Sequence, residues 1–341
     1  FSTTPILQHD ILARFLKNMA MLKAGFCTAL NDTVLGNLRS VGIKTTLDFI
    51  AKDLETVSQQ TSVPYKDLLA IRRVILAQYS GFPLTGAELY DNGVLSMAIL
   101  STGCTSIDEL LDGGLYTAEV TEVAGSIAAG KTQMCFTSAA SVIRKTKQNV
   151  IFVDTCGSFS AERIGIILEE NGVSEPEQLL SQIRCFTAFD VYELFETLEN
   201  IRHNKQLQMD PFFESLKLLI VDNVASVIYP ILGGPQSDGQ SLITILGQKL
   251  KILAVEFSLA VLVTNNLVSS EGGGSWSASL GRVWSHVPHT RLVILPHGNK
   301  STTETPERET HRQMKIVKSI RGPTNRCCNF VIASSGLSSV R

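Results

Sequence analysis

Hydrophobic and polar positions follow two different patterns along this chain, and the pattern changes near residue 96. Residues 24–79 carry apolar positions at helical spacing, separated by short polar turns. The strongest of these runs covers residues 65–79, directly after Val63-Pro64, which ends the run before it. Possible caps for the first two helices are Asn31 or Asp32, and Thr45 or Thr46. We therefore predict a small helical domain over residues 19–79.

From residue 99 onward, short β-rich apolar runs alternate with longer helical patterns. Strands are expected over residues 120–124, 150–153, 216–221, 259–263 and 291–295. Helices are expected over residues 131–144, 161–170, 191–203 and 241–256. Such alternation predicts an α/β core, residues 99–341, with a mostly parallel twisted sheet covered by helices on both faces.

Residues outside the two predicted folded parts indicate a linker between them and a tail before them. Turn-forming pairs such as Thr85-Gly86 predict a linker over residues 80–98. Residue 1 is Phe, so residues 1–18 are expected to be a tail upstream of a native start near Met19 or Met21. Turn-linked helices around Val41-Gly42-Ile43 resemble a helix-hairpin-helix module, which binds either DNA backbone or protein.

Composition narrows the class of protein. Hydrophobic residues make up 44% and charged residues 18% of 341, which is typical of a folded globular protein. The net charge of −2 does not favour nucleic-acid binding by the chain as a whole. No apolar run is long enough to span a membrane. Seven cysteines without metal-site spacing predict buried free thiols in a reducing compartment.

The clearest chemical signal is the sequence GSIAAGKT at residues 125–132. It meets the pattern G-x-x-x-x-G-K-[ST] of a P-loop, in which backbone N–H groups and a helix N-terminus hold phosphates. An expected strand precedes it and an expected helix follows it, as the motif requires. Lys131 is expected to contact the β- and γ-phosphates and Thr132 to bind Mg²⁺. The phosphate-binding residues are then Gly125, Ser126, Ile127, Ala128, Ala129, Gly130, Lys131 and Thr132.

Polar residues at the ends of three other expected strands belong to the same site. The apolar strand that ends in Asp222 has the Walker B pattern, so Asp222 is expected to hold Mg²⁺ directly or through water. Asp154 ends another strand and is either a carboxylate that activates water or a cap for the following turn. Asn266 follows a third strand and either senses the γ-phosphate or belongs to a turn.

These pieces, in this order, resemble the RecA-like recombinases of eukaryotes, including their paralogues in DNA repair. The resemblance runs from about residue 38 to the C-terminus. It rests on LSTGCTSIDELLDGGLYTAEVTEVAG (residues 100–125), GKTQ (130–133), VDTCGSFSAERI (153–164) and LGRVWSHVPHTRL (280–292). It implies that the chain binds ATP with Mg²⁺, that Lys131 and Asp222 are the catalytic P-loop and Walker B residues, and that Arg163 lies against the adenine base.

Two departures from the family pattern concern hydrolysis. The recombinases place a catalytic Glu where this chain has Cys156, and a neutral thiol is a poor replacement for a carboxylate that orients water. The sensor glutamine of the family corresponds to Asn266, which is one methylene shorter. Both changes predict retained ATP binding with slow hydrolysis, unless Asp154 or a neighbouring subunit supplies the base.

Further departures concern DNA and assembly. The loops expected to face DNA, residues 230–240 and 269–279, contain no Lys or Arg, although Trp276 could stack on a base or a partner. The aromatic-x-x-Ala peg of the family has altered spacing between Phe82 and Ala87, which favours specific partners over self-polymerisation. Basic residues near the C-terminus form either a solvated rim or an edge that contacts DNA or ATP. They are Arg308, Arg312, Lys315, Lys318, Arg321 and Arg326.

The resemblance therefore implies a nuclear DNA-repair protein that acts as a subunit of a mediator complex in homologous recombination. Its partners would be other recombinase paralogues, namely the B, C and X-ray-repair paralogues. Single-stranded or branched DNA would bind only weakly to the isolated chain. A self-sufficient single-stranded-DNA-dependent ATPase or strand-exchange enzyme and a nucleotide-independent scaffold remain as alternatives.

Overall fold

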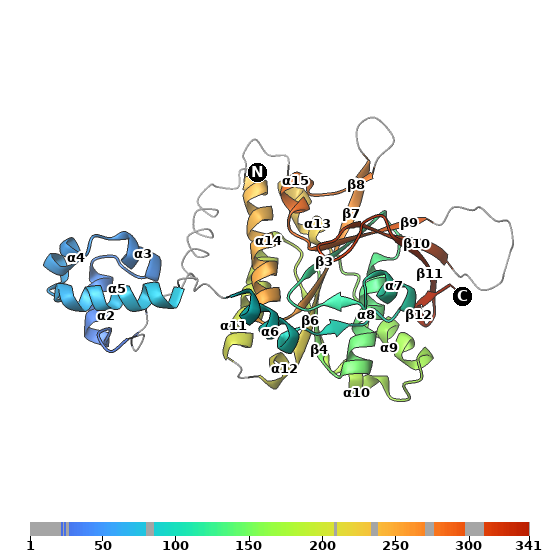
Figure 1. The fold of residues 1–341 in the computed structure, drawn as a ribbon, viewed down its shortest axis with the longest axis horizontal. Helices are drawn as coiled ribbons and strands as arrows, with labels where there is room; N and C mark the ends of the chain where they lie inside the picture. The colour runs from blue at the N-terminus through green and yellow to red at the C-terminus, as the bar shows by residue number, and fades with distance from the viewer. Residues whose placement is uncertain are drawn as a thin grey trace, which may run out of the picture. The chain divides into compact units, whose positions relative to one another are not determined.

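The computed structural model divides into two compact units, residues 1–89 and 90–341 (Figure 1). It describes residues 22, 24, 27–79, 85–207, 210–232, 238–269, 276–296 and 310–340. The tail expected over residues 1–18, and the candidate start residues Met19 and Met21, lie outside these ranges, as do Phe82 and Arg308.

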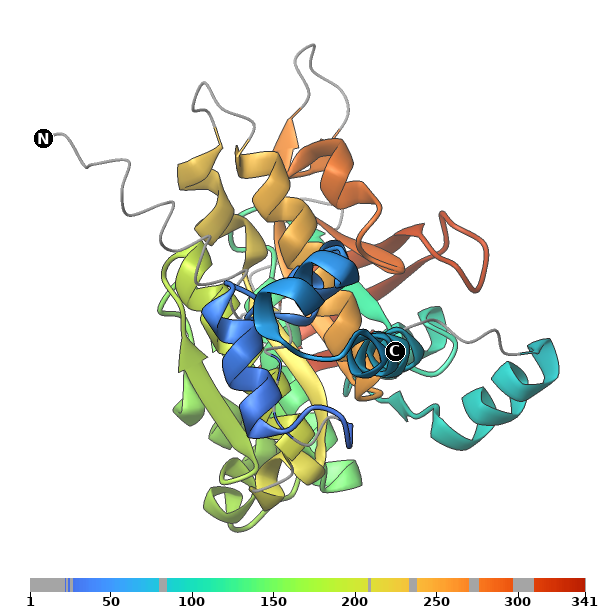
Figure 2. The ribbon, with the colours of Figure 1, turned by 90° about the vertical axis from the view of Figure 1, so that its left-hand side faces the viewer.

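In the described part of the N-terminal unit, short helices pack around one apolar core (Figures 1 and 2). The helices are α2 (Asp32–Ser40), α3 (Thr46–Ala51), α4 (Leu54–Thr61) and α5 (Tyr65–Tyr79). Of the two pairs of possible caps, Asn31 caps α2 and Thr45 caps α3. Thr45 Oγ1 accepts from the Asp48 N–H, and the Asp48 carboxylate accepts from the Thr45 N–H, so the start of α3 is fixed by a reciprocal pair of hydrogen bonds.

Within the segment expected to be a linker, residues 80–98, the structure has a helix that the turn signals did not predict, α6 (Gly86–Ser96). The start of α6 is fixed by Thr85 and Glu88. The Glu88 carboxylate accepts from the Thr85 N–H at 2.7 Å, and the Glu88 N–H donates to Thr85 Oγ1 at 3.2 Å. This capping box outweighs the turn signals inside the segment.

The second unit is built on one large sheet. Among the described residues, ten strands join it, in the order β12-β11-β10-β9-β3-β7-β6-β4-β5, with β8 beside β7. The run from β9 to β5 is parallel, whereas β8 and β10–β12 are antiparallel. The strands are β3 (Val120–Gly125), β4 (Asn149–Asp154), β5 (Ile183–Thr187), β6 (Leu216–Asp222), β7 (Ala260–Ser269), β8 (Trp276–Ala278), β9 (Thr290–Pro296), β10 (Thr310–Lys318), β11 (Cys327–Ala333) and β12 (Gly336–Ser339). A separate pair, β1 (Ile99–Leu100) and β2 (Leu115–Tyr116), precedes them.

Helices cover both faces of this sheet (Figure 1). On one side α8 packs with α9 and α10, and on the other α14 packs with α11, α13 and α15. The helices are α7 (Thr105–Leu110), α8 (Lys131–Thr146), α9 (Ala161–Glu170), α10 (Pro176–Leu180), α11 (Val191–Leu207), α12 (Pro211–Glu214), α13 (Val224–Ile228), α14 (Asp238–Glu256) and α15 (Gly281–Ser285), with a 3₁₀ turn at Tyr229–Ile231. The expected α/β core with a mostly parallel sheet is thus confirmed.

Burial explains why the central strands read as continuous apolar runs. Every residue of β3 and of β4 is buried, as expected for parallel strands covered on both faces. Their carboxyl ends, at Gly125 and Asp154, lie at the same edge of the sheet as Asp222 of β6. The polar residues that end the apolar strands, such as Asp154 and Asp222, therefore lie close together at this edge.

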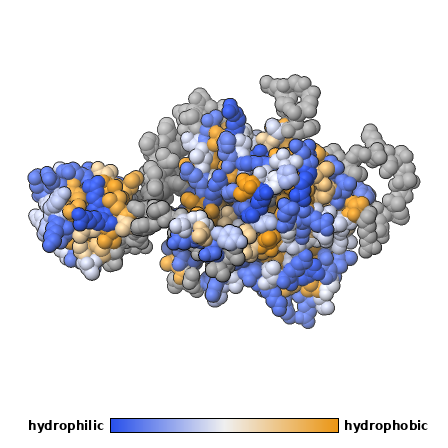
Figure 3. Space-filling view, viewed as in Figure 1, coloured by the Kyte–Doolittle hydropathy of each residue, from blue (hydrophilic) through white to orange (hydrophobic). Residues whose placement is uncertain are grey.

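Polar side chains cover much of the visible face of both units, with apolar ones interspersed (Figure 3). None of the helices within the described ranges is long and apolar enough to cross a membrane.

All seven cysteines are free, as expected, but not all are buried. Cys104 and Cys135 are buried, whereas Cys156, Cys185 and Cys327 are exposed.

Candidate nucleotide-binding site

The P-loop connects the end of β3 to the start of α8, in the strand–loop–helix arrangement that its sequence predicts. Ala128 and Gly130 both have positive φ, of 60° and 107°, which turns the backbone around the helix N-terminus. Ile127 at the tip is 90% exposed, so it is not a core residue. The loop backbone at the first turn of a 16-residue helix suits an anionic ligand.

Lys131 lies in the first turn of α8 and its side chain turns back over the loop. Its Nζ donates to the carbonyl oxygens of Gly125 and Ser126, at 2.9 Å each. Burial lowers the pKa of Lys131, and the nearby carboxylate of Asp222 opposes that shift. Lys131 is 9% exposed, and among the described residues its ammonium has no carboxylate at hydrogen-bond distance, so its charge is available to a phosphate.

Asp222 ends β6 beside the start of α8. Thr132 Oγ1 donates to one carboxylate oxygen at 2.6 Å, and Thr264 Oγ1 donates to the other. Burial raises the pKa of Asp222, while the two hydroxyls and Lys131 act in the opposite direction. The Thr132 hydroxyl and the Asp222 carboxylate therefore form a pair of adjacent hard oxygen ligands of the kind that Mg²⁺ prefers.

Asp154, the sequence candidate for a water-activating base, is instead a cap. Its carboxylate accepts from the backbone N–H groups of Cys156 at 3.0 Å, Ser158 at 3.1 Å and Phe159 at 2.9 Å. The residue is 2% exposed. A carboxylate that is buried and already accepts three hydrogen bonds is poorly placed to take a proton from water. Of the two alternatives that the sequence left open, the turn cap is the one observed.

Cys156 lies exposed on the loop that Asp154 caps, at the same sheet edge as the P-loop. Its Sγ is 3.6 Å from Thr155 Oγ1. Thr155 joins this loop to the end of β6, because its hydroxyl donates to Asn223 O at 2.7 Å and accepts from Asn223 N at 2.6 Å. Cys156 is thus held at the site without contributing a carboxylate.

Asn266 lies on β7 directly beside Gly125 of β3. Its carbonyl accepts from the Ser279 N–H at 2.9 Å, and its N–H donates to Asn265 Oδ1 at 2.7 Å. Asn266 therefore lies within the strand, next to the first glycine of the P-loop, and not in a turn. Its amide is half-buried at the edge that holds the other site residues.

A buried polar network behind this edge was missed by sequence reasoning. The Glu122 carboxylate, fully buried, accepts from Asn265 Nδ2 at 2.7 Å and from Trp284 Nε1 at 2.8 Å, and it pairs with Arg291. Asn265 Nδ2 also donates to Ser279 O at 3.1 Å. An isolated Glu inside an expected buried strand was the available signal, since such a charge requires partners.

Arg163 lies in the first turn of α9, facing the first turn of α8. Its Nε donates to Gln133 Oε1 at 3.0 Å, and its two terminal nitrogens donate to the carbonyls of Ala333 and Ser334. Burial lowers its pKa. Arg163 therefore contacts the P-loop helix through Gln133, and it also binds the C-terminal hairpin, which nothing in the sequence indicated.

These residues fit a magnesium–nucleotide complex. The loop supplies backbone groups at a helix N-terminus, Lys131 supplies a partly buried charge, and Thr132 with Asp222 supplies adjacent oxygens. Elsewhere in the described ranges, no group of three or more His, Cys, Asp or Glu side chains is placed to hold a metal ion.

Half of the residues in the segments expected to contact DNA, 233–237 and 270–275, lie outside the described residues, and the side chain of Trp276 is not described. Of the C-terminal basic residues, four bind groups of the same chain, and Arg312 does so through Nη1, which donates to His311 O at 2.9 Å. Lys318 donates to Ser285 O at 2.8 Å, Arg321 pairs with Glu119, and Arg326 pairs with Asp112 at 3.2 Å.

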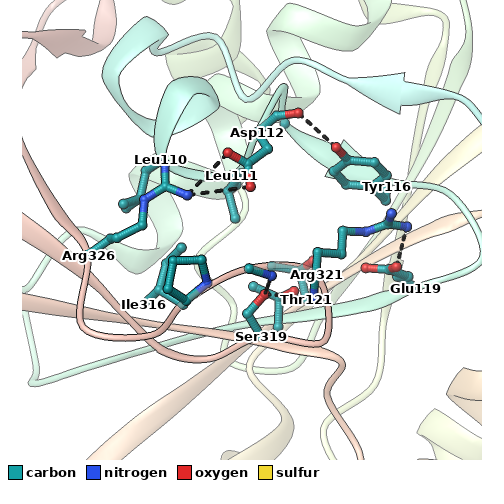
Figure 4. Close-up of a pocket in the computed structure, with 14 residues that line it drawn as sticks. Leu110, Leu111, Asp112, Tyr116, Glu119, Thr121, Ile316, Ser319, Arg321 and Arg326 are labelled. Carbon is teal, nitrogen blue, oxygen red and sulfur yellow. Dashed lines mark hydrogen bonds and ion pairs between the residues drawn. The ribbon is translucent and has the colours of Figure 1, made fainter.

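Arg321 and Arg326 belong to a small hollow away from the P-loop (Figure 4). The Arg321 guanidinium lies over the Tyr116 ring at 3.6 Å, and the Tyr116 hydroxyl donates to Asp112 O at 2.7 Å. The enclosed volume of about 10 Å³ is enough for a single water at most. This hollow is a set of mutually satisfied polar contacts and not a ligand site.

The fold and the residues at this edge define a P-loop protein with a RecA-like core. Comparisons with known proteins agree. A family model described as Rad51 matches residues 95–340, and one described as RAD51D, N-terminal domain, matches residues 19–78. The chain belongs to the Rad51 family, whose members bind ATP and act in DNA recombination and repair.

Individual relatives give the same result. The chain is 42% identical over 308 residues to the DNA repair protein RAD51 homolog 4 of Bos taurus, covering 90% of this chain and 93% of the bovine protein. It is 41% identical to RAD51 homolog 4 of Mus musculus, with coverage of 90% and 92%. Human RAD51 homolog 2 is 29% identical over 248 residues, with coverage of 61% and 63%. The chain is thus similar to the D paralogue within the Rad51 family.

Proposed function

We propose that this chain is an ATP-binding subunit of a recombinase-paralogue mediator complex, which acts in the nucleus in the homologous-recombination repair of double-strand breaks. ATP binds with Mg²⁺ at residues 125–132, with Lys131 on the β- and γ-phosphates and with Thr132 and Asp222 on the metal. Its partners are other Rad51 paralogues, of the B, C and X-ray-repair types. Contact with single-stranded or branched DNA is shared with those partners.

One observation carries this proposal: the side chains for binding a nucleotide are complete, while those for hydrolysing it are not. Lys131, Thr132 and Asp222 lie together at one sheet edge. At the same edge Cys156 replaces the carboxylate, and Asp154 is committed to capping a turn. Binding without fast hydrolysis suits a nucleotide that stabilises an assembly for long periods.

Bound Mg·ATP would supply negative charge and a metal centre that hold the P-loop, β6 and β4 in one arrangement. Within the chain, Lys131 would exchange its bonds to the Gly125 and Ser126 carbonyls for phosphate oxygens. Thr155 keeps the end of β4 fixed to β6 throughout, through Asn223. The site therefore acts as a switch for assembly and not as a motor.

The test combines nucleotide affinity with complex formation. Lys131→Ala should weaken Mg·ATP binding by at least about 100-fold, because it removes a partly buried charge from the phosphates. It should also reduce co-purification with co-expressed sister paralogues in Mg·ATP. Lys147→Ala, at the other end of α8, is the matched control and should change neither measurement.

Three outcomes would contradict the proposal. Fast ATP turnover by the isolated chain, stimulated by single-stranded DNA, would support a self-sufficient enzyme. Filaments of the isolated chain on single-stranded DNA at micromolar concentration would do the same. Unchanged ATP binding and assembly in Lys131→Ala would support a nucleotide-independent scaffold.

A further inference from the structure

Besides the small hollow of Figure 4, the second unit has a larger pocket, of about 230 Å³. Residues that line it come just before three strands of the parallel part of the sheet: Glu119 before β3, Ser258 before β7 and His289 before β9. The P-loop follows the carboxyl end of β3. This pocket and the nucleotide site therefore lie at opposite edges of the sheet.

The walls of this pocket are mostly apolar. Met97 and Ile320 line it and are 45% and 61% exposed, and Gly93 and Ala118 add no polar side chain. Sites for drug-sized ligands have volumes of ~300–1,000 Å³, so a pocket of this size suits a single large side chain. No Phe, Tyr or Trp of the described residues lines it, so it offers a nucleic-acid base no such ring for stacking.

His289 supplies a fixed hydrogen-bond donor at this pocket. Its Nδ1 accepts from the Val120 N–H at 2.9 Å, and its backbone N–H donates to Val120 O at 2.8 Å. Burial and the charges of nearby lysines and Arg321 lower the pKa of His289, which favours the neutral ring. The proton of that ring is then on Nε2, and no described residue accepts a hydrogen bond from it.

Two ammonium groups lie at the same edge of the sheet. Lys318, at the end of β10, donates to Ser285 O at 2.8 Å, and Lys251 of α14 donates to His286 O at 3.1 Å. These carbonyls are consecutive at the end of α15, so the two lysines are neighbours, and each ammonium has further N–H donors to offer. Burial lowers the pKa of Lys318, and the charges of Arg291 and Lys251 lower it further.

The nearby carboxylates are committed to other cations. Glu119 pairs with Arg321, and Glu122 pairs with Arg291. The charges of the two lysines are therefore not matched by these carboxylates. Unmatched positive charge beside an apolar pocket complements a partner that carries negative charge on both sides of an apolar side chain.

We propose that this pocket, together with Lys251 and Lys318, is a docking site for an acidic segment of a partner protein, which inserts one large apolar side chain into it. Carboxylates that flank the inserted side chain bind the two ammonium groups. The Nε2–H of His289 donates to an oxygen of the segment. This inference goes beyond the proposed function, because the site is at the other end of β3 from the P-loop and requires no nucleotide.

The experiment uses a fluorescein-labelled peptide in which one phenylalanine is flanked on both sides by glutamates. Its binding to the full chain is followed by fluorescence anisotropy at low ionic strength, without nucleotide. Replacing the phenylalanine by alanine should weaken binding at least about tenfold, the value of one large apolar side chain that becomes buried. A peptide with lysines in place of the glutamates should not bind, because its charges repel Lys251 and Lys318.

Variants of the chain show where the peptide binds. Ile320→Ser removes part of the apolar wall and should weaken binding at least about threefold. Lys251→Gln and Lys318→Gln should each weaken it about threefold, as expected for partly exposed charge pairs. As controls, Leu207→Ser replaces an apolar side chain of similar exposure, 51%, and Lys66→Gln removes an exposed charge on α5. Neither control should change the affinity.

A wild type that does not bind the acidic peptide, or affinities that are unchanged in Ile320→Ser and in the two lysine variants, would overturn the inference. A single-stranded oligonucleotide that depends on Lys251 and Lys318 but not on Ile320 would also overturn it, because the cations would then serve nucleic acid. Self-association of the wild type that Ile320→Ser abolishes would place a second copy in the pocket, against the inference. Failure to bind Mg·ATP would overturn the proposed function alone, because this measurement contains no nucleotide.

Discussion

Replacing Cys156 with glutamate tests directly why this site should hydrolyse ATP slowly. The thiol is exposed and its nearest described polar contact is Thr155 Oγ1 at 3.6 Å, so a longer side chain displaces no packed group. Exposed substitutions of this kind change stability by less than about 0.5 kcal/mol. The neighbouring charge of Lys131 favours an ionised carboxylate there.

The expected gain follows from what a positioned carboxylate contributes. General base catalysis accelerates reactions by about 10²–10⁴-fold when the geometry is optimal. The loop around Cys156 is fixed by Asp154 and Thr155, but it was not selected to aim a carboxylate. We therefore expect a gain below that range, about 10–100-fold in kcat, which corresponds to about 1.4–2.7 kcal/mol of activation free energy.

The assay is steady-state phosphate release at saturating Mg·ATP, with Cys156→Gln as the control of equal size and no charge. Only Cys156→Glu should show the gain, and adding Lys131→Ala should abolish it. Equal rates in the Glu and Gln variants, with Mg·ATP binding intact, would refute the reasoning, because the missing carboxylate would then not be what limits hydrolysis.

Three further predictions concern stability. Burial raises the pKa of Asp222, so the protonated carboxyl stabilises the folded state at acid pH, and this contribution is lost as the pH rises through the folded-state pKa. Asp222→Asn removes the buried charge and should raise the unfolding free energy of the nucleotide-free protein at pH 7 by about 1 kcal/mol. A lower thermal midpoint in this variant would contradict the prediction. Glu122→Gln leaves the charge of Arg291 buried without its partner and should cost about 3 kcal/mol in denaturant unfolding, whereas exposed Glu162→Gln should cost almost nothing. Thr45→Ala removes the cap of α3 and should cost about 1 kcal/mol; unchanged hydrogen exchange in residues 46–51 would argue against it.

The parts of the fold that sequence predicted well are those fixed by local signals. Helix α9 spans 161–170 as expected, and α8 and the buried strand β3 differ from expectation by only one or two residues at an end. In these segments apolar periodicity, capping and the P-loop all agree. The meeting of Lys131, Thr132 and Asp222 also followed from sequence, because parallel strands bring their carboxyl ends to one edge.

The parts that were missed depend on distant contacts or on competing local signals. Strands β10–β12 carry many polar residues, so their apolar alternation is weak, and they form because β9 offers them an edge. Helix α6 was hidden by turn-forming residues that its capping box overrides. The capping role of Asp154 depends on loop geometry, and the bonds of Arg163 reach residues 170 positions later, which no local pattern encodes.

That last separation has a consequence for the order in which the protein is made. Arg163 leaves the ribosome roughly 10–30 s before Ala333, at the usual 5–20 residues per second. Throughout that interval the phosphate loop and α8 lack the strand that covers them. Nucleotide binding should therefore be among the last properties that the nascent chain acquires. A chain that ends before residue 333 would carry an intact P-loop motif but would lack the hairpin turn that binds Arg163.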